Sequence, residues 1–220
     1  MFITYTDIGL FQSYDAGVSW TGAPLGIPST WRTRLTSPVG KLTLYACGFG
    51  RGVYKSIDNG KTWTLKNNGI EKKQPFAWRL TRAEDGTLYL VVARRSERGR
   101  SGDDDDGALY KSSDGGEHWL KMNLPAGTNG PMSLVLDPST KGRMYLSAWG
   151  VARLTGDTGG GVFLSTEAGR PGRVFLVSHN VVLDPVDQKS IYITTFGGSV
   201  WHGPATGDAT SKEDILTPLN

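Results

Sequence analysis

The sequence has one cysteine, three histidines and no long apolar run, and each shortage excludes a class of protein. Cys47 cannot form a disulfide within the chain, and its apolar neighbours predict a buried thiol rather than a reactive one. The histidines are far apart and show no metal-ligand spacing, so we expect no metal site. No segment approaches the roughly 18 apolar residues of a membrane-spanning helix. No motif indicates a cofactor, and we expect none.

The charge is close to balanced. The net charge of +3 is spread along the chain without a basic stripe interleaved with aromatic residues, so we expect no nucleic-acid partner. Residues 1–7 lack the charged and apolar regions of a secretory signal peptide, and they predict a strand instead.

Glycine, by contrast, is abundant. Thirty glycines and eleven prolines accompany 38% hydrophobic residues. This composition is typical of many short strands joined by tight turns, and it is too apolar for a disordered chain. We therefore expect an all-β protein.

One eight-residue pattern, Ser-x-Asp-x-Gly-x-x-Trp, occurs at residues 13–20, 56–63 and 112–119. A degenerate copy at residues 165–169 keeps the serine, an acidic residue and the glycine. The acidic positions of the four copies lie 43, 56 and 53 residues apart, which is the period of a β-propeller blade. Each copy follows a strand with alternating apolar residues. The repeat predicts blades of four antiparallel strands, A to D, with the pattern at the C–D turn.

The blade count defines the expected domain organisation. We expect a β-propeller of about four to five blades over residues 1–205 and a polar tail over residues 206–220. The first blade lacks an A strand, and the fifth has strands A, B and C. The chain is therefore either an irregular five-bladed ring or an arc, such as half, of a larger propeller. We favour the arc, whose end blades would expose sheet faces that need partners.

The repeated pattern has a structural explanation. An aspartate at a turn accepts hydrogen bonds from nearby backbone N–H groups, and the glycine allows a positive φ. The tryptophan opens strand D and is expected to bury its ring beside the next blade. We assign this structural role, rather than catalysis, to Asp15, Gly17, Trp20, Asp58, Gly60, Trp63, Asp114, Gly116 and Trp119.

Residues 1–203 resemble the Asp-box (BNR) repeat proteins, which include sialidases, sortilin-type receptors, photosystem II assembly factors and glycoside hydrolase family 74. The shared turn selects no chemistry among these groups. The Arg-Ile-Pro segment of sialidases is missing here. Residues 5–11, Tyr-Thr-Asp-Ile-Gly-Leu-Phe, are similar to a family 74 segment whose aspartate is a catalytic carboxylate. The resemblance implies that role for Asp7, although Leu10 replaces the second glycine of that segment.

Family 74 enzymes, as the resemblance implies, bind sugar between two propellers that each supply one carboxylate. Inverting glycosidases hold their acid and base roughly 6.5–9.5 Å apart. Asp7 is the only candidate in this sequence, so its partner would come from another chain or from further sequence. The resemblance also implies an extracellular or periplasmic location.

In a propeller, the B–C and D–A loops share the face opposite the C–D turns. Two B–C loops, residues 94–107 and 149–161, are expanded, which predicts a functional surface. Aromatic rings beside arginines suit a sugar, and the candidate binding residues are Trp31, Phe49, Arg51, Trp78, Arg95, Trp149 and Arg153. Packing between blades is the favoured alternative for Trp31 and Trp78. The run Asp103–Asp106 suggests calcium, but consecutive carboxylates converge poorly on one ion, so we favour a solvated loop.

Three functions remain open from the sequence. The first is a non-catalytic module that binds glycan or protein through its B–C/D–A loop face, as a subunit or fragment of a larger assembly. The second is one lobe of a family 74-like glycoside hydrolase that acts on xyloglucan or a related β-glucan, with Asp7 as acid or base. The third is a subunit that docks through its open blade edges, by self-association or against a second propeller.

Overall fold

The structure is a computed structural model that describes residues 2–5, 9–22, 33–36, 43–48, 50–71, 75–93, 107–124, 130–148, 161–165, 178–195, 200–205 and 217–218. Every helix or strand assigned within these ranges is a β-strand. The chain divides into two compact units, Met1–Ala93 with Leu109–Met122, and Arg94–Ala108 with Asn123–Asn220.

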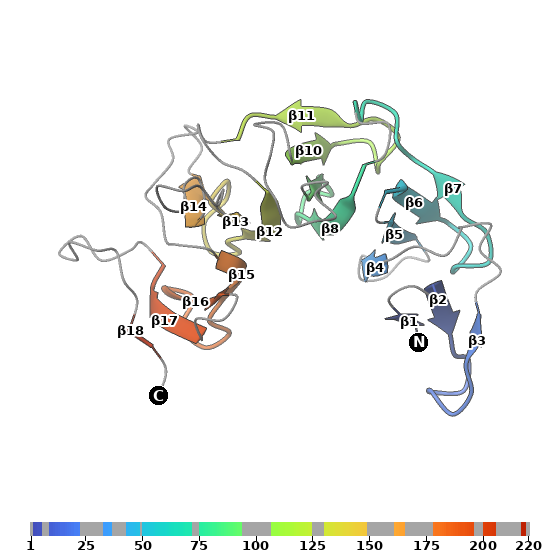
Figure 1. Ribbon diagram of the computed structural model, residues 1–220, viewed down its shortest axis with the longest axis horizontal. Helices are drawn as coiled ribbons and strands as arrows, with labels where there is room; N and C mark the ends of the chain where they lie inside the picture. The colour runs from blue at the N-terminus through green and yellow to red at the C-terminus, as the bar shows by residue number, and fades with distance from the viewer. Residues whose placement is uncertain are drawn as a thin grey trace, which may run out of the picture. The chain divides into compact units, whose positions relative to one another are not determined.

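The first unit contains three antiparallel sheets, which we call blades one to three (Figure 1). The strands of each sheet pair in chain order, as the expected A–B–C–D meander requires. Blade one has β1 (Phe2–Tyr5), β2 (Gly9–Gln12) and β3 (Thr21–Gly22); blade two has β4 (Thr33–Thr36), β5 (Leu44–Gly48), β6 (Gly52–Ser56) and β7 (Thr64–Leu65); blade three has β8 (Ala77–Arg82), β9 (Leu88–Val92), β10 (Ala108–Ser112) and β11 (Leu120–Met122).

The second unit contains blades four and five. Blade four has β12 (Pro131–Leu136), β13 (Met144–Ala148) and β14 (Gly161–Ser165); blade five has β15 (Ser178–Leu183), β16 (Ser190–Thr195), β17 (Val200–Pro204) and β18 (Thr217–Pro218). Strand β18 falls in the segment expected to be a polar tail, and it pairs with β17 as a fourth strand. The predicted all-β architecture of antiparallel blades is confirmed.

Strands β5 and β9, the B strands of blades two and three, lie in the core of the first unit. Strand β5 is buried over its whole length, and β9 is buried except at Tyr89. Strand β9 (Leu-Tyr-Leu-Val-Val) consists of aliphatic and aromatic residues, whereas β5 (Leu-Tyr-Ala-Cys-Gly) contains small residues as well. Cys47 lies in β5 and is a buried free thiol, as predicted.

One cross-strand row of residues occurs in blades two, four and five. It joins one residue of strand A, a tyrosine of strand B and one residue of strand C, and we call it the tyrosine row. The rows are Thr36–Tyr45–Lys55 in blade two, Val135–Tyr145–Leu164 in blade four and Val182–Tyr192–His202 in blade five. In blade two the row faces blade three, because Tyr45 Oη donates a 2.9 Å hydrogen bond to the carbonyl of Gly115.

We expect Gly116→Ala to destabilise the fold by about 1–3 kcal/mol, because a side chain at positive φ is strained. Gly116 has φ +86°, and an added Cβ would lie 3.3 Å from Cε1 of Tyr45. Urea unfolding measures the difference. Gly22→Ala is the matched control, because an added Cβ there meets nothing within 4 Å and its stability should hardly change. Equal effects of the two substitutions would contradict this account.

Candidate functional site

The C–D turns of blades one to three, which we call aspartate turns (residues 13–20, 56–63 and 112–119), contain the same serine contacts. In each turn the serine Oγ donates to Oδ1 of the aspartate, at 2.7, 2.8 and 2.8 Å. The same Oγ accepts the N–H of the glycine four residues later, at 2.7, 2.8 and 2.9 Å. The serine therefore ties the start of the turn to its middle.

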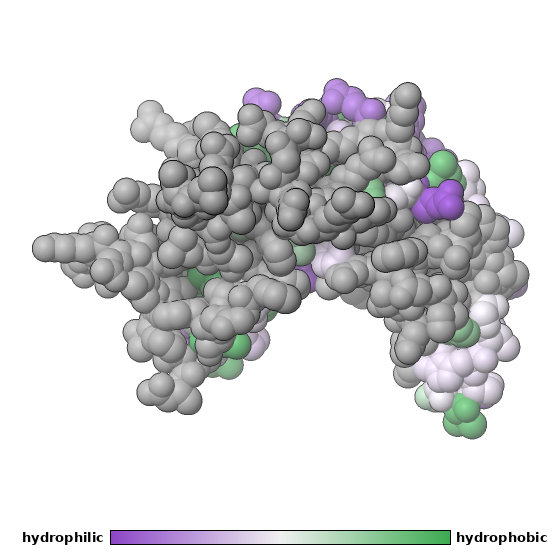
Figure 2. Space-filling view, viewed as in Figure 1, coloured by the Kyte–Doolittle hydropathy of each residue, from purple (hydrophilic) through white to green (hydrophobic). Residues whose placement is uncertain are grey.

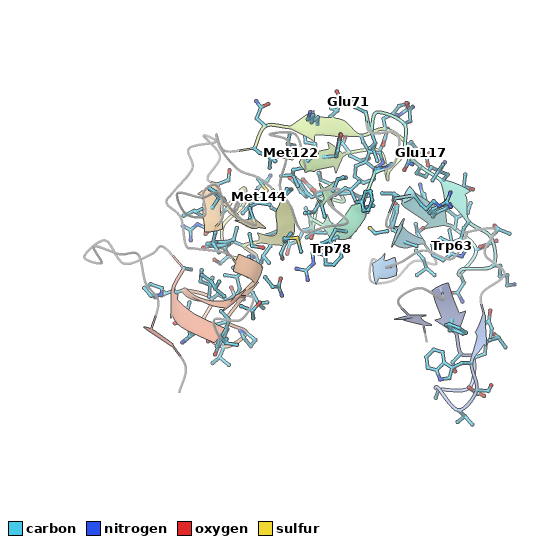
Figure 3. All side chains as sticks on the ribbon, in the orientation of Figure 1. Trp63, Glu71, Trp78, Glu117, Met122 and Met144 are labelled. Carbon is cyan, nitrogen blue, oxygen red and sulfur yellow. The ribbon has the colours of Figure 1, made fainter. Side chains whose placement is uncertain are left out.

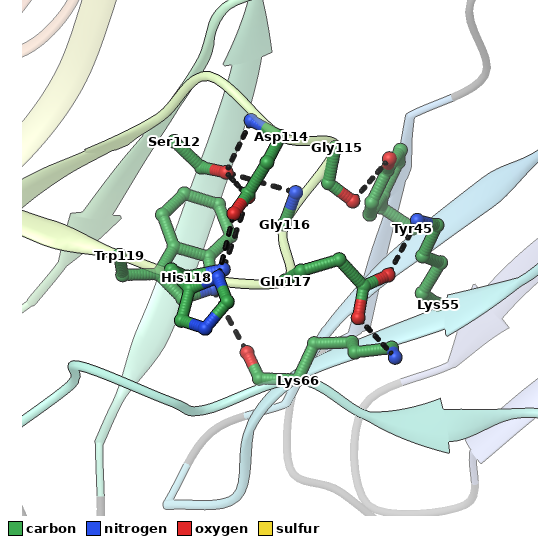
Figure 4. Close-up of polar contacts among 10 residues, drawn as sticks. All are labelled: Tyr45, Lys55, Lys66, Ser112, Asp114, Gly115, Gly116, Glu117, His118 and Trp119. Atoms are coloured by element: carbon green, nitrogen blue, oxygen red, sulfur yellow. Dashed lines mark hydrogen bonds and ion pairs between the residues drawn. The ribbon is translucent and has the colours of Figure 1, made fainter.

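The aspartate closes the rest of the turn. Its Oδ1 accepts the backbone N–H four residues later, at 2.9, 2.9 and 3.0 Å. Its Oδ2 pairs with the side chain of that same residue, which is Ser19, Thr62 or His118. These contacts support two consecutive residues at positive φ, of which the first is Ala16 (58°), Asn59 (61°) or Gly115 (71°). Each carboxylate is thus engaged in holding its own turn, as Figure 4 shows for Asp114.

These hydrogen bonds favour the ionised form of the carboxylates. The Thr62 hydroxyl and backbone N–H, followed by Ser56, lower the pKa of Asp58 to about 2. The hydroxyl and N–H of Ser19 hold the pKa of Asp15 well below its usual range, and the N–H and ring of His118 do the same for the pKa of Asp114. Low pKa values fit groups that stay charged rather than groups that exchange protons near neutral pH.

The three turn tryptophans differ in their contacts. Trp20 and Trp63 donate their indole N–H to the carbonyl of the glycine in their own turn, at 3.1 Å. Trp119 instead donates to the carbonyl of Lys66 in the preceding blade, at 2.9 Å, and is 2% exposed. Trp20 is exposed and Trp63 partly buried. The predicted burial is therefore correct for Trp119, against the preceding rather than the next blade, and wrong for Trp20.

Blades two and three are joined by an ionic contact beside Trp119 (Figure 4), and Figure 3 shows the position of its carboxylate residue, Glu117. Glu117 Oε1 lies 2.9 Å from Lys55 Nζ, and its Oε2 lies 2.6 Å from Lys66 Nζ. The ammonium groups of Lys66 and Lys55 lower the pKa of Glu117. Burial and the nearby Glu117 raise the pKa of Tyr45. This side of the turn therefore serves as a joint between blades.

The other end of strand β6 carries the one exposed candidate binding residue that the structure describes. Arg51 lies in the turn between β5 and β6, where its N–H donates to the carbonyl of Gly48 at 3.1 Å. Asn67 holds this turn from the segment after β7: its Nδ2 donates to the Arg51 carbonyl at 3.0 Å, and its Oδ1 accepts the Val53 N–H at 2.9 Å. Arg51 is thus held at the end of β6 opposite the aspartate turn.

The close approach of Asn67 requires glycine at position 52. A Cβ on Gly52 would lie 2.1 Å from Oδ1 of Asn67, and the φ of Gly52 is +90°. The N–H of Gly52 donates to the carbonyl of Pro75, which precedes blade three, at 3.1 Å. The turn that presents Arg51 is therefore tied to the end of blade two through Asn67 and to the segment before blade three through Pro75.

The remaining predicted site residues have separate outcomes. Trp78 lies in β8 and is buried, as the packing alternative expects, and its part in binding stays a prediction. The other members of the set lie outside the described residues, together with Asp103–Asp106: Asp7, Trp31, Phe49, Arg95, Trp149 and Arg153.

Sequence reasoning missed Asn67, Glu117 and the tyrosine rows. The recurring tyrosine of the B strands was the available signal for the rows. Asn67 and Glu117 lie in or near turns and carry no pattern that distinguishes them from other polar turn residues.

Within the part of the chain that the structure describes, no three His, Cys, Asp or Glu side chains are grouped so as to hold a metal ion. In the same part, no helix has the length and hydrophobicity needed to cross a membrane.

Comparison with known sequences gives two relatives of limited similarity. No family model matches the chain. The chain is 26% identical over 156 residues to an oligoxyloglucan-reducing end-specific xyloglucanase from Emericella nidulans, covering 68% of this chain and 19% of that protein. It is 26% identical over 228 residues to a xyloglucanase from Hypocrea jecorina, covering 93% of this chain and 26% of that protein. The chain thus spans about a fifth to a quarter of the length of these curated relatives.

Comparison with solved structures concerns the fold. A GH74 enzyme from Niastella koreensis has a TM-score of 0.68 at 22% identity, covering 91% of this chain and 34% of that one. YCF48 bound to D1 peptide has a TM-score of 0.62 at 16% identity, covering 94% and 61%. The fold is a β-propeller. The predicted fold class is therefore confirmed, including the blade architecture on which the loop face depends.

Acid should destabilise the aspartate turns, and Asp58→Asn should reduce that sensitivity. Because the pKa of Asp58 falls from 3.8 to about 2 on folding, its stabilising effect is present above pH 4 and is lost as the pH falls towards 2. Urea unfolding midpoints between pH 7 and pH 2 measure this. We expect Asp58→Asn to be less stable at pH 7 and to lose less stability in acid. Glu84→Gln, which removes an exposed carboxylate between β8 and β9, should behave as wild type.

Proposed function

We propose that this chain contributes propeller blades to a glycoside hydrolase of the family 74 type, acting on xyloglucan or a related β-glucan. The observation that carries the proposal is the similarity to two curated xyloglucanases over 68% and 93% of the chain. The fold shared with a GH74 enzyme supports it. On this proposal the aspartate turns are Asp-box repeats, and the protein acts outside the cytoplasm, in the extracellular or periplasmic space.

The proposed chemistry needs two carboxylates, one as acid and one as base. Asp7 is the candidate of this chain, and the second carboxylate is supplied from outside it. The aspartates of the three turns are poor alternatives, because their oxygens are occupied by hydrogen bonds within the turn. This division assigns catalysis to the loop face and stability to the turn face.

Arg51 is the described residue proposed to contact the substrate. Its exposed side chain lies at the end of β6 away from the aspartate turn, and Asn67 fixes the backbone beneath it. A guanidinium group offers several donors to sugar hydroxyls. The other proposed sugar contacts are those of the candidate binding set.

A non-catalytic protein-binding module is the second candidate. The observation that favours it is the similarity to YCF48, whose structure is described as bound to D1 peptide and which this chain covers to 61%. In this case the same loop face would hold an extended peptide.

We expect Arg51→Ala to weaken binding of xyloglucan oligosaccharides roughly tenfold, because a hydrogen bond from a charged group contributes about 1.5–3 kcal/mol. Isothermal titration calorimetry on the purified chain measures the affinity. Lys61→Ala removes one exposed cation from the aspartate turn at the opposite end of β6, and it should leave the affinity unchanged. Equal losses in both variants, or no binding by the wild type, would contradict the proposal.

We expect Asp7→Asn to lower kcat on xyloglucan by roughly 100-fold or more, because general acid–base catalysis contributes about 10²–10⁴-fold. Reducing-sugar release is measured in the full gene product that carries this sequence, with Glu84→Gln as the control that keeps activity. Equal turnover by wild type and Asp7→Asn would remove Asp7 from the mechanism. Zero turnover by both would sink the hydrolase proposal and leave the binding module.

A further inference from the structure

The tyrosine row of blade four is covered by the following blade, blade five. Tyr145 is 1% exposed, and it packs in one apolar cluster with Val181, Ile191 and Ile193 of blade five. The adjacent pair Ser147–Val162, two residues along the same side of the sheet, is also buried. In the second unit, the tyrosine row is therefore the surface against which the following blade packs.

The equivalent surface of blade five is uncovered among the residues that the structure describes. Val182 replaces Val135 at the strand A position and is 46% exposed. Val200, which replaces the buried Val162, is 37% exposed. Figure 2 shows hydrophobic surface over this blade. Positions that are buried or partly buried in blade four thus carry exposed valines in blade five.

The polar groups of this row are already satisfied inside blade five. His202 Nε2 lies 3.0 Å from Oδ2 of Asp184, and the rings of His202 and Tyr192 are stacked with centroids 4.3 Å apart. A hydrogen bond to Asp184 raises the pKa of Tyr192. In blade two, by contrast, Tyr45 and Lys55 turn their polar atoms to the following blade. A partner of blade five therefore needs to offer apolar surface rather than a charged group.

Blade one offers such surface at the corresponding position. In blade three, Glu117 is the residue of the aspartate turn that reaches the row of the preceding blade, where it meets Lys55. Its equivalent in blade one is Val18, which is 87% exposed. Tyr14 and Trp20 of the same turn are also exposed, and Figure 2 shows hydrophobic surface at this end of blade one. Val18 is an aliphatic side chain that can pack on the exposed Val182 and on the stacked rings of Tyr192 and His202.

We propose that the tyrosine row of blade five docks on the aspartate turn of blade one in a second copy of this chain. The contact is heterologous, because Val182 and Val18 belong to different surfaces of the same molecule. It resembles the covered row between blades four and five. This inference goes beyond the proposed function and does not depend on it.

Sedimentation velocity across a wide range of protein concentration tests the contact. The wild type should associate reversibly as concentration rises. Val182→Lys should weaken association roughly tenfold or more, because it buries an unpaired charge in an apolar contact. Its exposed position lets the variant fold, which circular dichroism verifies. Val186→Lys is the matched control, since Val186 is 94% exposed on the turn after β15 and lies outside the row.

The partner surface is tested in the same way. Val18→Lys should weaken association as Val182→Lys does, whereas Ile57→Lys, at an exposed position in the turn of blade two, should not. A wild type that stays monomeric at every concentration would overturn the proposal. Association that survives Val182→Lys or Val18→Lys, or that Val186→Lys abolishes equally, would overturn it as well.

Discussion

The carboxylate of the aspartate turn is the group on which the blade joints depend. It holds two consecutive residues at positive φ, a backbone shape that regular strand pairing does not support. In blade three the shape aims three groups at blade two: the Gly115 carbonyl at Tyr45, Glu117 at two lysines, and the Trp119 indole at the Lys66 carbonyl. A turn formed within eight residues thereby fixes a contact between residues 70 apart.

The aspartate turn of blade two also influences the opposite face of that blade. It sets where strand β7 begins, and Asn67 lies two residues after the end of β7. Asn67 then fixes both sides of Gly52, beside Arg51, through its amide. The chain of contacts from Asp58 to Arg51 runs through hydrogen bonds and one strand pair, so the stability of the turn face and the geometry of the loop face are linked.

The sequence predicted the blades because the turn chemistry is local. Serine, aspartate and glycine at fixed spacing form the same hydrogen bonds in all three described turns. The sequence could not predict which turn tryptophans are buried, because other segments of the chain set the environment of each ring. Trp63 and Trp119 occupy the same position of the motif, yet only Trp119 meets the Asn67–Gly69 segment, where a Cβ on Gly69 would collide with its carbonyl. The hydrogen bonds of Asn67 to Arg51 and Val53 could not be predicted for the same reason.

The tyrosine rows explain how near-identical blades can still be distinguished. The strand C position of the row is Lys55 in blade two, where it needs a carboxylate; Leu164 in blade four, where it needs an aliphatic surface; and His202 in blade five, where it is satisfied within the sheet. Exchanging partners would leave a lysine facing an apolar surface, and an unpaired buried charge is costly. The side chain at the strand C position of each tyrosine row therefore favours one neighbouring blade. The aspartate turns, by contrast, have the same backbone conformation in blades one to three.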